Sequence, residues 1–209
     1  MSRLNHAAIL GAGGHGKVIA EIIEDLGFAT VDLFDNEWPD LNRKGSWFVV
    51  GKESEFFERL DNFECLAIAY TNNQRRLSII NQLLAMSVEP MPIVHRKAMI
   101  SKRSKIGFGT QVCIGAIVQT DVELGHGVII NTAASIDHDC QIADGVQVGP
   151  GARLAGGVSI GNCATIGAGA ILLPNISVGH SAVVGAGSVV LHDVPPETTV
   201  VGRPARSIQ

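Results

Sequence analysis

The sequence is poor in aromatic residues and has no long hydrophobic run. Only 10 of its 209 residues are Phe, Trp or Tyr, and nine of these ten lie before residue 100. Because no stretch of about 18 apolar residues occurs, we expect no membrane-spanning helix and no membrane partner. The first nine residues lack the cationic and apolar segments of a secretory signal, so we expect a cytoplasmic protein.

The net charge and the spacing of the cysteines also differ from those of nucleic-acid-binding and zinc-binding proteins. The formal net charge is −4, which argues against a nucleic-acid surface. The four cysteines, Cys65, Cys113, Cys140 and Cys163, match no zinc pattern. Disulfides are uncommon in the cytoplasm, so we interpret these cysteines as small buried thiols and predict no metal site.

Glycine is abundant where aromatic residues are scarce. Sixteen of the 24 glycines fall between residues 100 and 194, and Arg153 is the only Lys or Arg between residues 106 and 194. This change of composition divides the chain near residue 95. We therefore expect two domains, residues 1–94 and residues 95–209.

The first domain alternates strand and helix patterns. The expected strands cover residues 7–10, 31–34 and 65–70, and the expected helices cover residues 17–26, 53–60 and 73–86. Gly27 is a suitable residue to end the first helix, and Asn72 is a suitable cap for the last. Such alternation predicts a small α/β domain built on a parallel sheet.

The second domain is a six-residue repeat. From Ile100 to Val190 every sixth residue is Ile, Leu or Val, sixteen positions in succession. Composition alone would give this with odds of about one in 10⁹. The residue four places later in each hexapeptide is small or modest in size. The period predicts a β-solenoid whose aliphatic side chains stack inside, and so narrow an interior explains the scarcity of aromatic residues.

A glycine-rich loop, residues 11–16, follows the first expected strand. Its spacing matches the G-x-G-x-x-G pattern of dinucleotide-binding proteins, and Asp35 lies nineteen residues past Gly16. The loop offers backbone amides at a helix N-terminus, near a carboxylate suited to a hydroxyl group. A domain of about 90 residues is short for a complete dinucleotide-binding fold. From the residues alone, a nucleotide site and a structural tight turn both remain open.

His138 is a candidate general base. It lies between Asp137 and Asp139 at the third place of its hexapeptide, at or near an outward corner of the solenoid. A neighbouring carboxylate fixes the tautomer of an imidazole and stabilises its protonated form. A solvated surface patch is the alternative interpretation of the same three residues. Cys140 occupies an inward position, which disfavours a covalent intermediate on that thiol.

The motifs together resemble one branch of the left-handed β-helix acyltransferases. They are the loop at residues 11–16, the junction Val94-His95…Ile100-Ser101, the segments 131–132 and 136–140, and Gly202-Arg203-Pro204-Ala205. Over essentially its full length the chain is similar to bacterial nucleotide-amino-sugar N-acetyltransferases of the bacillosamine and perosamine type, and to sialic-acid O-acetyltransferases. The resemblance implies a Rossmann-like α/β N-terminal domain followed by a left-handed parallel β-helix with three hexapeptides per coil.

The resemblance also implies an activity. It is direct transfer of an acetyl group from acetyl-CoA to the amine of a nucleotide-linked amino sugar, such as a 4-amino-4,6-dideoxy sugar, for bacterial surface glycans. O-acetylation of a sugar of the sialic-acid type is the close alternative. A homotrimer is implied, with donor and acceptor meeting in clefts between neighbouring solenoids.

The resemblance assigns roles residue by residue. His138 aligns with the family's catalytic base, and Asp139 aligns with its acidic helper. The residues implied to surround the nucleotide sugar are Gly13, Gly14, His15, Asp35, Asn36, Thr71 and Asn131. The residues implied to line the coenzyme A groove are Gln147, Gly156, Ala168 and Ala186. Relatives commonly carry a histidine where this chain has Gln147, which can donate a hydrogen bond but cannot transfer a proton.

Three other classes agree less well with the sequence. A solenoid carbonic anhydrase needs three converging histidines, whereas His126 and His138 fall on different faces under three-per-coil geometry and no third partner is placed. A nucleotidyltransferase with a solenoid tail would need a much larger first domain. A purely structural solenoid would not bind acetyl-CoA.

Overall fold

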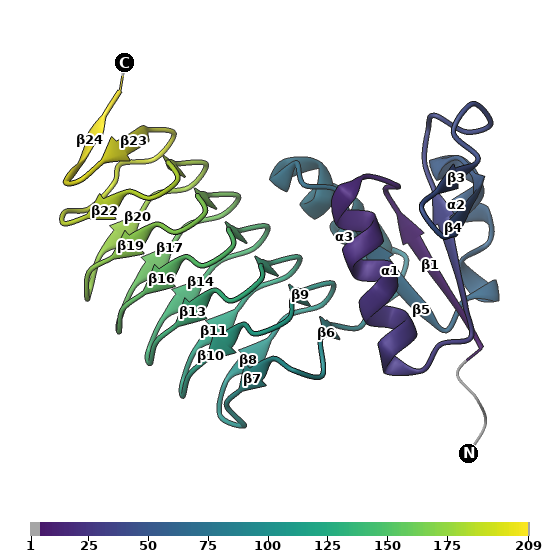
Figure 1. Cartoon of the computed structure of the whole chain (residues 1–209), viewed down its shortest axis with the longest axis horizontal. Coiled ribbons are helices and arrows are strands. Elements are labelled where there is room, and N and C mark those ends of the chain that lie inside the picture. Colours follow the sequence, from purple (N-terminus) through teal and green to yellow (C-terminus); the bar gives the residue numbers. More distant parts are fainter. Residues whose placement is uncertain (1–4, 209) are drawn as a thin grey trace.

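The computed structural model describes residues 5–208 and divides into two parts (Figure 1). The N-terminal part is an α/β domain, and the C-terminal part is a stack of short-stranded coils that extends away from it. The C-terminus lies at the far end of the stack (Figure 1).

The N-terminal domain is a sheet with helices on both faces. Its strands are β1 (His6–Leu10), β2 (Thr30–Phe34), β3 (Arg43–Lys44), β4 (Trp47–Gly51) and β5 (Cys65–Ile68), in the order β3-β4-β2-β1-β5. Its helices are α1 (Gly14–Leu26), α2 (Glu53–Glu58) and α3 (Asn73–Ala85), with a 3₁₀ turn at Leu60–Asn62. All pairs are parallel except β3 with β4.

Local sequence signals place most of these elements. The expected strands and helices are confirmed to within a few residues, whereas β3 and β4 were not predicted. Gly27 ends α1 in the left-handed region at φ 108°, and the Asn72 carboxamide oxygen accepts the Arg75 backbone N–H at 2.9 Å. Alternation along β1 separates the two layers of the core. Ala7 and Ile9 pack with α1, while Ala8 and Leu10 pack with α2 and α3.

The second part is a triangular prism, and each of its three faces is a sheet of parallel strands except that β24 pairs antiparallel with β23. Face A contains β6 (Ile93–Val94), β9 (Gln111–Val112), β12 (Ile129–Ile130), β15 (Gln147–Val148), β18 (Thr165–Ile166), β21 (Val183–Val184), β23 (Thr199–Gly202) and β24 (Ala205–Ser207). Face B contains β7 (Met99–Ile100), β10 (Ile117–Val118), β13 (Ser135–Ile136), β16 (Arg153–Leu154), β19 (Ile171–Leu172) and β22 (Val189–Val190). Face C contains β8 (Lys105–Ile106), β11 (Glu123–Leu124), β14 (Gln141–Ile142), β17 (Ser159–Ile160) and β20 (Ser177–Val178).

The register fixes three hexapeptides per coil. Ile117 pairs with Ser135, and Ser135 in turn pairs with Arg153, so each pairing steps along the chain by one whole coil. The turns form three columns, which we call corner AB (for example residues 131–133), corner BC (residues 137–139) and corner CA (residues 125–127). Residues that are one coil apart therefore lie directly above one another.

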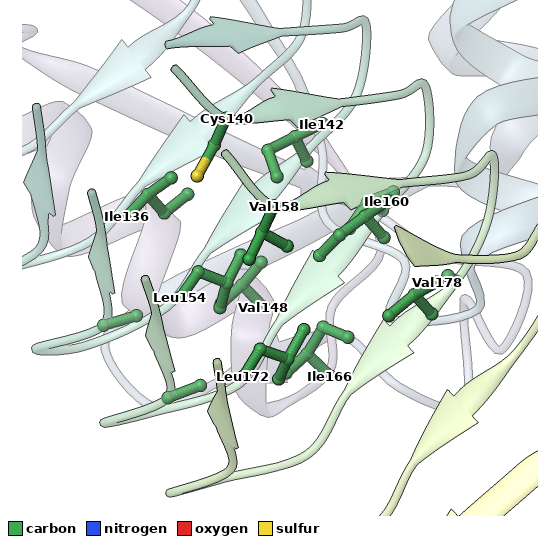
Figure 2. Close-up of a cluster of buried hydrophobic side chains, with 14 of the residues drawn as sticks. Ile136, Cys140, Ile142, Val148, Leu154, Val158, Ile160, Ile166, Leu172 and Val178 are labelled. Atoms are coloured by element: carbon green, nitrogen blue, oxygen red, sulfur yellow. The ribbon is translucent and has the colours of Figure 1, made fainter. Parts of the chain in front are cut away.

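The prism core consists of the repeated aliphatic residues. Figure 2 shows Ile136, Ile142, Val148 and Leu154 directed into the interior beside Cys140. These side chains are buried, and the described core holds no aromatic residue. At the far end of the stack, Val194 and Val200 belong to the prism core and β23 pairs with β21.

Helix α3 joins the two domains at corner CA. Gly109 and Gly127 have left-handed φ values of 65° and 61° there, and a Cβ on either would come within 2.8 Å of the Ile80 side chain. The column of glycines therefore suits both the turn and the helix that packs on it.

A buried arginine fixes this contact. The Arg76 guanidinium donates to the carbonyls of Gly127 at 2.7 Å, of Gly145 at 2.8 Å and of Tyr70 at 2.8 Å. Asn73 donates in addition to the Thr165 hydroxyl at 2.9 Å. Burial lowers the pKa of Arg76 to about 10, so the side chain stays charged at neutral pH.

We predict that Arg76→Ala weakens the N-terminal domain far more than Arg75→Ala. Loss of Arg76 leaves three carbonyls without their donor and should cost about 3 kcal/mol. Arg75 forms an exposed pair with Glu53, and its loss should cost less than about 1 kcal/mol. Urea unfolding followed by tryptophan fluorescence measures this, because both tryptophans, Trp38 and Trp47, lie in this domain. Equal midpoints for the two variants would contradict the prediction.

Candidate active site

The Asp-His-Asp segment forms the outer turn of corner BC. The His138 Nδ1 lies 2.7 Å from the Asp139 Oδ2, and the His138 backbone N–H donates to the Asp137 Oδ1 at 2.8 Å. Asp139 adopts a left-handed φ of 59°, which turns its carboxylate back toward the ring. The side chains of His138 and Asp139 are 57% and 67% exposed, so the corner is open to a ligand.

This geometry selects one basic nitrogen. A carboxylate can only accept, so the His138 Nδ1 carries the proton and Nε2 has a free lone pair in the neutral ring. The hydrogen bond to Asp139 raises the pKa of His138, and the charge of Asp137 acts in the same direction. The neighbouring Cys140 is buried, and burial raises the pKa of its thiol. That cysteine is therefore a poor nucleophile.

Gly156 provides the space for the imidazole. It lies one coil above His138 at corner BC, and a Cβ on it would come 2.5 Å from Cε1 and 2.6 Å from Nε2 of the ring. A hollow of about 300 Å³ opens beside them. Its lining consists of Asp137, His138, Asp139, Ala155, Gly156, Gly157, Pro174 and Asn175.

A larger hollow of about 830 Å³ runs along the outer side of face C. The only histidine that lines it is His126, whose Nδ1 accepts the Phe108 backbone N–H at 2.9 Å and whose ring stacks on Phe108. These contacts give His126 a structural role at corner CA. The smaller hollow, which His138 lines, is therefore the candidate for a reacting centre. Within residues 5–208 no group of three His, Cys, Asp or Glu side chains could hold a metal ion.

A second candidate site lies at the carboxyl ends of the N-terminal strands. The loop after β1, the turn after β2 and the segment after β5 meet at this edge of the sheet. A Cβ on Gly13 or Gly14 would meet nothing within 4 Å, whereas one on Gly16 would strike the Gly11 carbonyl. Close packing thus explains why residue 16 is a glycine. Gly13 and Gly14, by contrast, leave the backbone amides open to a ligand.

The polar residues expected here are brought to the same edge. Asp35 accepts the Ala12 backbone N–H at 2.8 Å, which ties the turn after β2 to the glycine-rich loop. Asn36 accepts the Glu53 backbone N–H at 3.2 Å, and Thr71 is exposed just beyond β5. The His15 Nε2 lies within hydrogen-bond distance, 2.7 Å, of the Gln111 Oε1 of the prism.

The other expected ligand contacts lie away from His138 within one chain. Asn131, Ala168 and Ala186 are on corner AB, and Gln147 is on face A. Face B separates corner AB from corner BC, and face A is opposite corner BC. Of the four expected coenzyme A contacts, only Gly156 adjoins His138 in the same protomer.

Two residues that sequence reasoning did not single out connect the carboxyl edge of the N-terminal sheet to the prism. Arg76 bonds both to the Tyr70 carbonyl, just beyond β5 at this edge of the sheet, and to the prism. Gln111 contacts both the glycine-rich loop and β5. Both are polar side chains buried only because one domain covers the other. No local pattern in the sequence predicts that the other domain buries these two side chains.

Comparisons with known proteins match this architecture. The PglD N-terminal domain family matches residues 6–83. A curated relative, the UDP-N-acetylbacillosamine N-acetyltransferase of Bacillus subtilis, is 37% identical over 113 residues. That alignment spans 52% of this chain and 51% of the relative, about half of each.

No helix among residues 5–208 is long and apolar enough to cross a bilayer.

Two solved structures match over nearly the whole chain. The acetyltransferase domain of PglB from Neisseria gonorrhoeae, in complex with acetyl coenzyme A, has a TM-score of 0.93 and 33% identity, covering 97% of this chain and 98% of that one. PerB from Caulobacter crescentus, in complex with CoA and GDP-perosamine, has a TM-score of 0.88 and 30% identity, covering 98% and 97%.

We predict that Asp139→Asn lowers the pKa of His138. The carboxylate stabilises the protonated ring, so the wild-type pKa should lie above 6.5 and the variant pKa should fall toward or below that value. Asparagine tolerates the left-handed backbone of this position, so the turn should survive. A titration of the imidazole by NMR gives both values. An unchanged pKa would show that the Asp139 contact does not form in solution.

Proposed function

This chain belongs to the left-handed β-helix family of nucleotide-amino-sugar N-acetyltransferases, and from that premise we propose that it acetylates the amine of a nucleotide-linked amino sugar with acetyl-CoA. The observation that carries the proposal is the His138–Asp139 pair at 2.7 Å, because both residues line an open hollow. A 4-amino-4,6-dideoxy sugar is the proposed acceptor, because the relatives named above act on or bind bacillosamine and perosamine derivatives.

The proposed chemistry is direct transfer. The neutral sugar amine attacks the thioester carbonyl carbon, and the His138 Nε2 takes the proton that the nitrogen loses as the C–N bond forms. The C–S bond then breaks, and the CoA thiolate leaves with a proton from the imidazolium. Asp139 holds the ring by Nδ1 and stabilises its positive charge between these steps. Because Cys140 is buried with a raised pKa, no acetyl-enzyme is proposed.

The nucleotide part of the acceptor is proposed to bind the N-terminal edge. The free amides of Gly13 and Gly14 suit phosphate oxygens at the start of α1. Asp35, Asn36 and Thr71 surround the same edge and suit hydroxyl and base contacts. Asp35 also holds the Ala12 amide, so it would shape the loop as well as bind.

The complete site is proposed to form between protomers of a homotrimer. Corner BC carries His138 and Gly156, whereas corner AB and face A carry Asn131, Ala168, Ala186 and Gln147. In a three-membered ring with face B toward the axis, corner BC of one protomer meets corner AB of the next. Gln147 of that neighbour would donate a hydrogen bond to the donor carbonyl without transferring a proton. Light scattering that shows a monomer would contradict this arrangement.

We predict that His138→Ala lowers kcat by about 10²–10⁴, the usual contribution of a general base. The assay uses acetyl-CoA with the UDP-, GDP- or dTDP-linked amino sugar that gives the largest thermal shift with the wild-type protein. The wild-type rate should rise with pH through the pKa of His138. Full activity of His138→Ala would refute the mechanism.

An assay that compares the amino sugar with a matched acceptor, which has a hydroxyl in place of the amine, distinguishes N-acetylation from O-acetylation. We expect acetylation of the amino sugar alone. Preferential acetylation of the hydroxyl acceptor would favour the sialic-acid type of reaction, which uses the same donor and base.

We predict that Gly156→Ala also reduces kcat, by displacing the His138 ring. The added methyl would lie 2.5–2.6 Å from ring atoms, and the ring is the part free to move. Thermal stability should change little, because a mobile, exposed side chain relieves the contact. A variant with normal kcat would show that the ring position is not critical.

A further inference from the structure

Gln111 of the prism lies against the nucleotide edge of the other domain. It is the outward residue of β9 on face A, a position that is exposed or half-exposed at Gln141 and Gln147 in later strands of the prism. Here the side chain is only 1% exposed, because the N-terminal domain covers it. A buried carboxamide needs partners for both of its ends.

Both partners of Gln111 come from the candidate nucleotide site. Its Nε2 donates to the carbonyl of Ile68, the last residue of β5, at 2.8 Å. Its Oε1 lies 2.7 Å from Nε2 of His15, which is in the glycine-rich loop. One carboxamide therefore joins the two segments of the edge and links both to the prism.

The Ile68 carbonyl determines the orientation of this chain of bonds. A carbonyl can only accept, so the amide nitrogen of Gln111 must face it and the amide oxygen must face His15. An oxygen acceptor requires a proton on the His15 Nε2. Burial lowers the pKa of His15, and the nearby positive charge of Arg76 adds to that effect. The neutral ring then has its lone pair on Nδ1.

We propose that Gln111 is a positioning residue of the nucleotide-sugar site, holding His15 in the Nε2-protonated tautomer so that Nδ1 accepts a hydrogen bond from the nucleotide sugar. The proposal rests on the proposed function and adds a prism residue to a site otherwise built by the N-terminal domain. It also connects the two halves of the reaction, because the prism that carries His138 sets the geometry of the acceptor site.

The test compares Gln111→Met with Thr165→Val. Gln111→Met keeps the side-chain length and removes both bonds. Thr165→Val removes a hydrogen bond to Asn73 that also crosses the domain interface but does not involve His15. The probes are acetyl-CoA and the UDP-, GDP- or dTDP-linked 4-amino sugar that stabilises the wild-type protein most.

We expect Gln111→Met to weaken nucleotide-sugar binding about tenfold, the value of one neutral hydrogen bond, with acetyl-CoA binding unchanged. Thr165→Val should leave both affinities unchanged. The ¹⁵N shifts of the His15 ring should show the Nε2-protonated tautomer in the wild type and lose that signature in Gln111→Met. If Gln111 only tied the two domains together, Gln111→Met would leave nucleotide-sugar affinity unchanged, as Thr165→Val should.

Unchanged nucleotide-sugar affinity in Gln111→Met, or an equal loss in Thr165→Val, would overturn the inference. If Gln111→Met fails to fold, Gln111→Glu serves, because a carboxylate cannot donate to Ile68 and favours a doubly protonated ring without a lone pair; unchanged affinity there overturns the inference too. A wild-type protein that binds none of the three nucleotide sugars overturns the proposed function itself. Binding by the wild type with no effect of either Gln111 variant overturns the inference alone.

Discussion

The parallel register of the prism, one coil to the next, is the constraint on which the other features depend. Each residue lies above its counterpart of the previous coil, as Ile117, Ser135 and Arg153 do. The interior then becomes stacked columns of aliphatic side chains, and the turns become three fixed corners. A residue's place in the repeat determines which corner or face it occupies. The candidate functional residues are single residues at the corners of this frame.

The corner positions explain why the imidazole of His138 is accessible and oriented. A solenoid turn exposes its middle residue, and the residue that follows often adopts a left-handed backbone, as Asp139 does. That backbone brings the carboxylate to Nδ1 and leaves Nε2 free. The coil above must then make room for the ring, which Gly156 does by having no side chain. Three corner residues thus produce an oriented, accessible imidazole without any help from the core.

The contact between the domains has a different physical basis. Hydrophobic packing of Ile80 against the glycine column is combined with a buried cation, Arg76, whose partners are carbonyl oxygens. Carbonyls at a turn have fixed directions, so the guanidinium fork fits one placement of α3. This specificity matters because α3 follows β5 directly. The prism therefore sets where the carboxyl edge of the N-terminal sheet lies relative to the corner that carries His138.

Sequence predicted the periodic features and not the contacts between domains. A six-residue period over sixteen hexapeptides determines the interior, so the prism and the outward place of His138 could be predicted. Likewise β1, α1 and the capping Asn72 follow from local patterns. Spacing alone did not give three hexapeptides per coil, and hence did not show that Gln147, nine residues after His138, lies half a coil away. Gln111 and Arg76 resemble ordinary surface residues until the opposite domain covers them.

Because Gln147 lies half a coil away from His138, we propose that the reacting site forms between two neighbouring protomers. The most direct measurement mixes two inactive variants, His138→Ala at corner BC and Ala168→Trp, which would block the donor groove at the exposed corner AB. In mixed rings assembled from equal amounts, about a quarter of the interfaces combine an intact His138 with an intact groove. We expect recovery of about a quarter of wild-type activity, whereas mixed assemblies that stay as inactive as their parents would contradict a shared site.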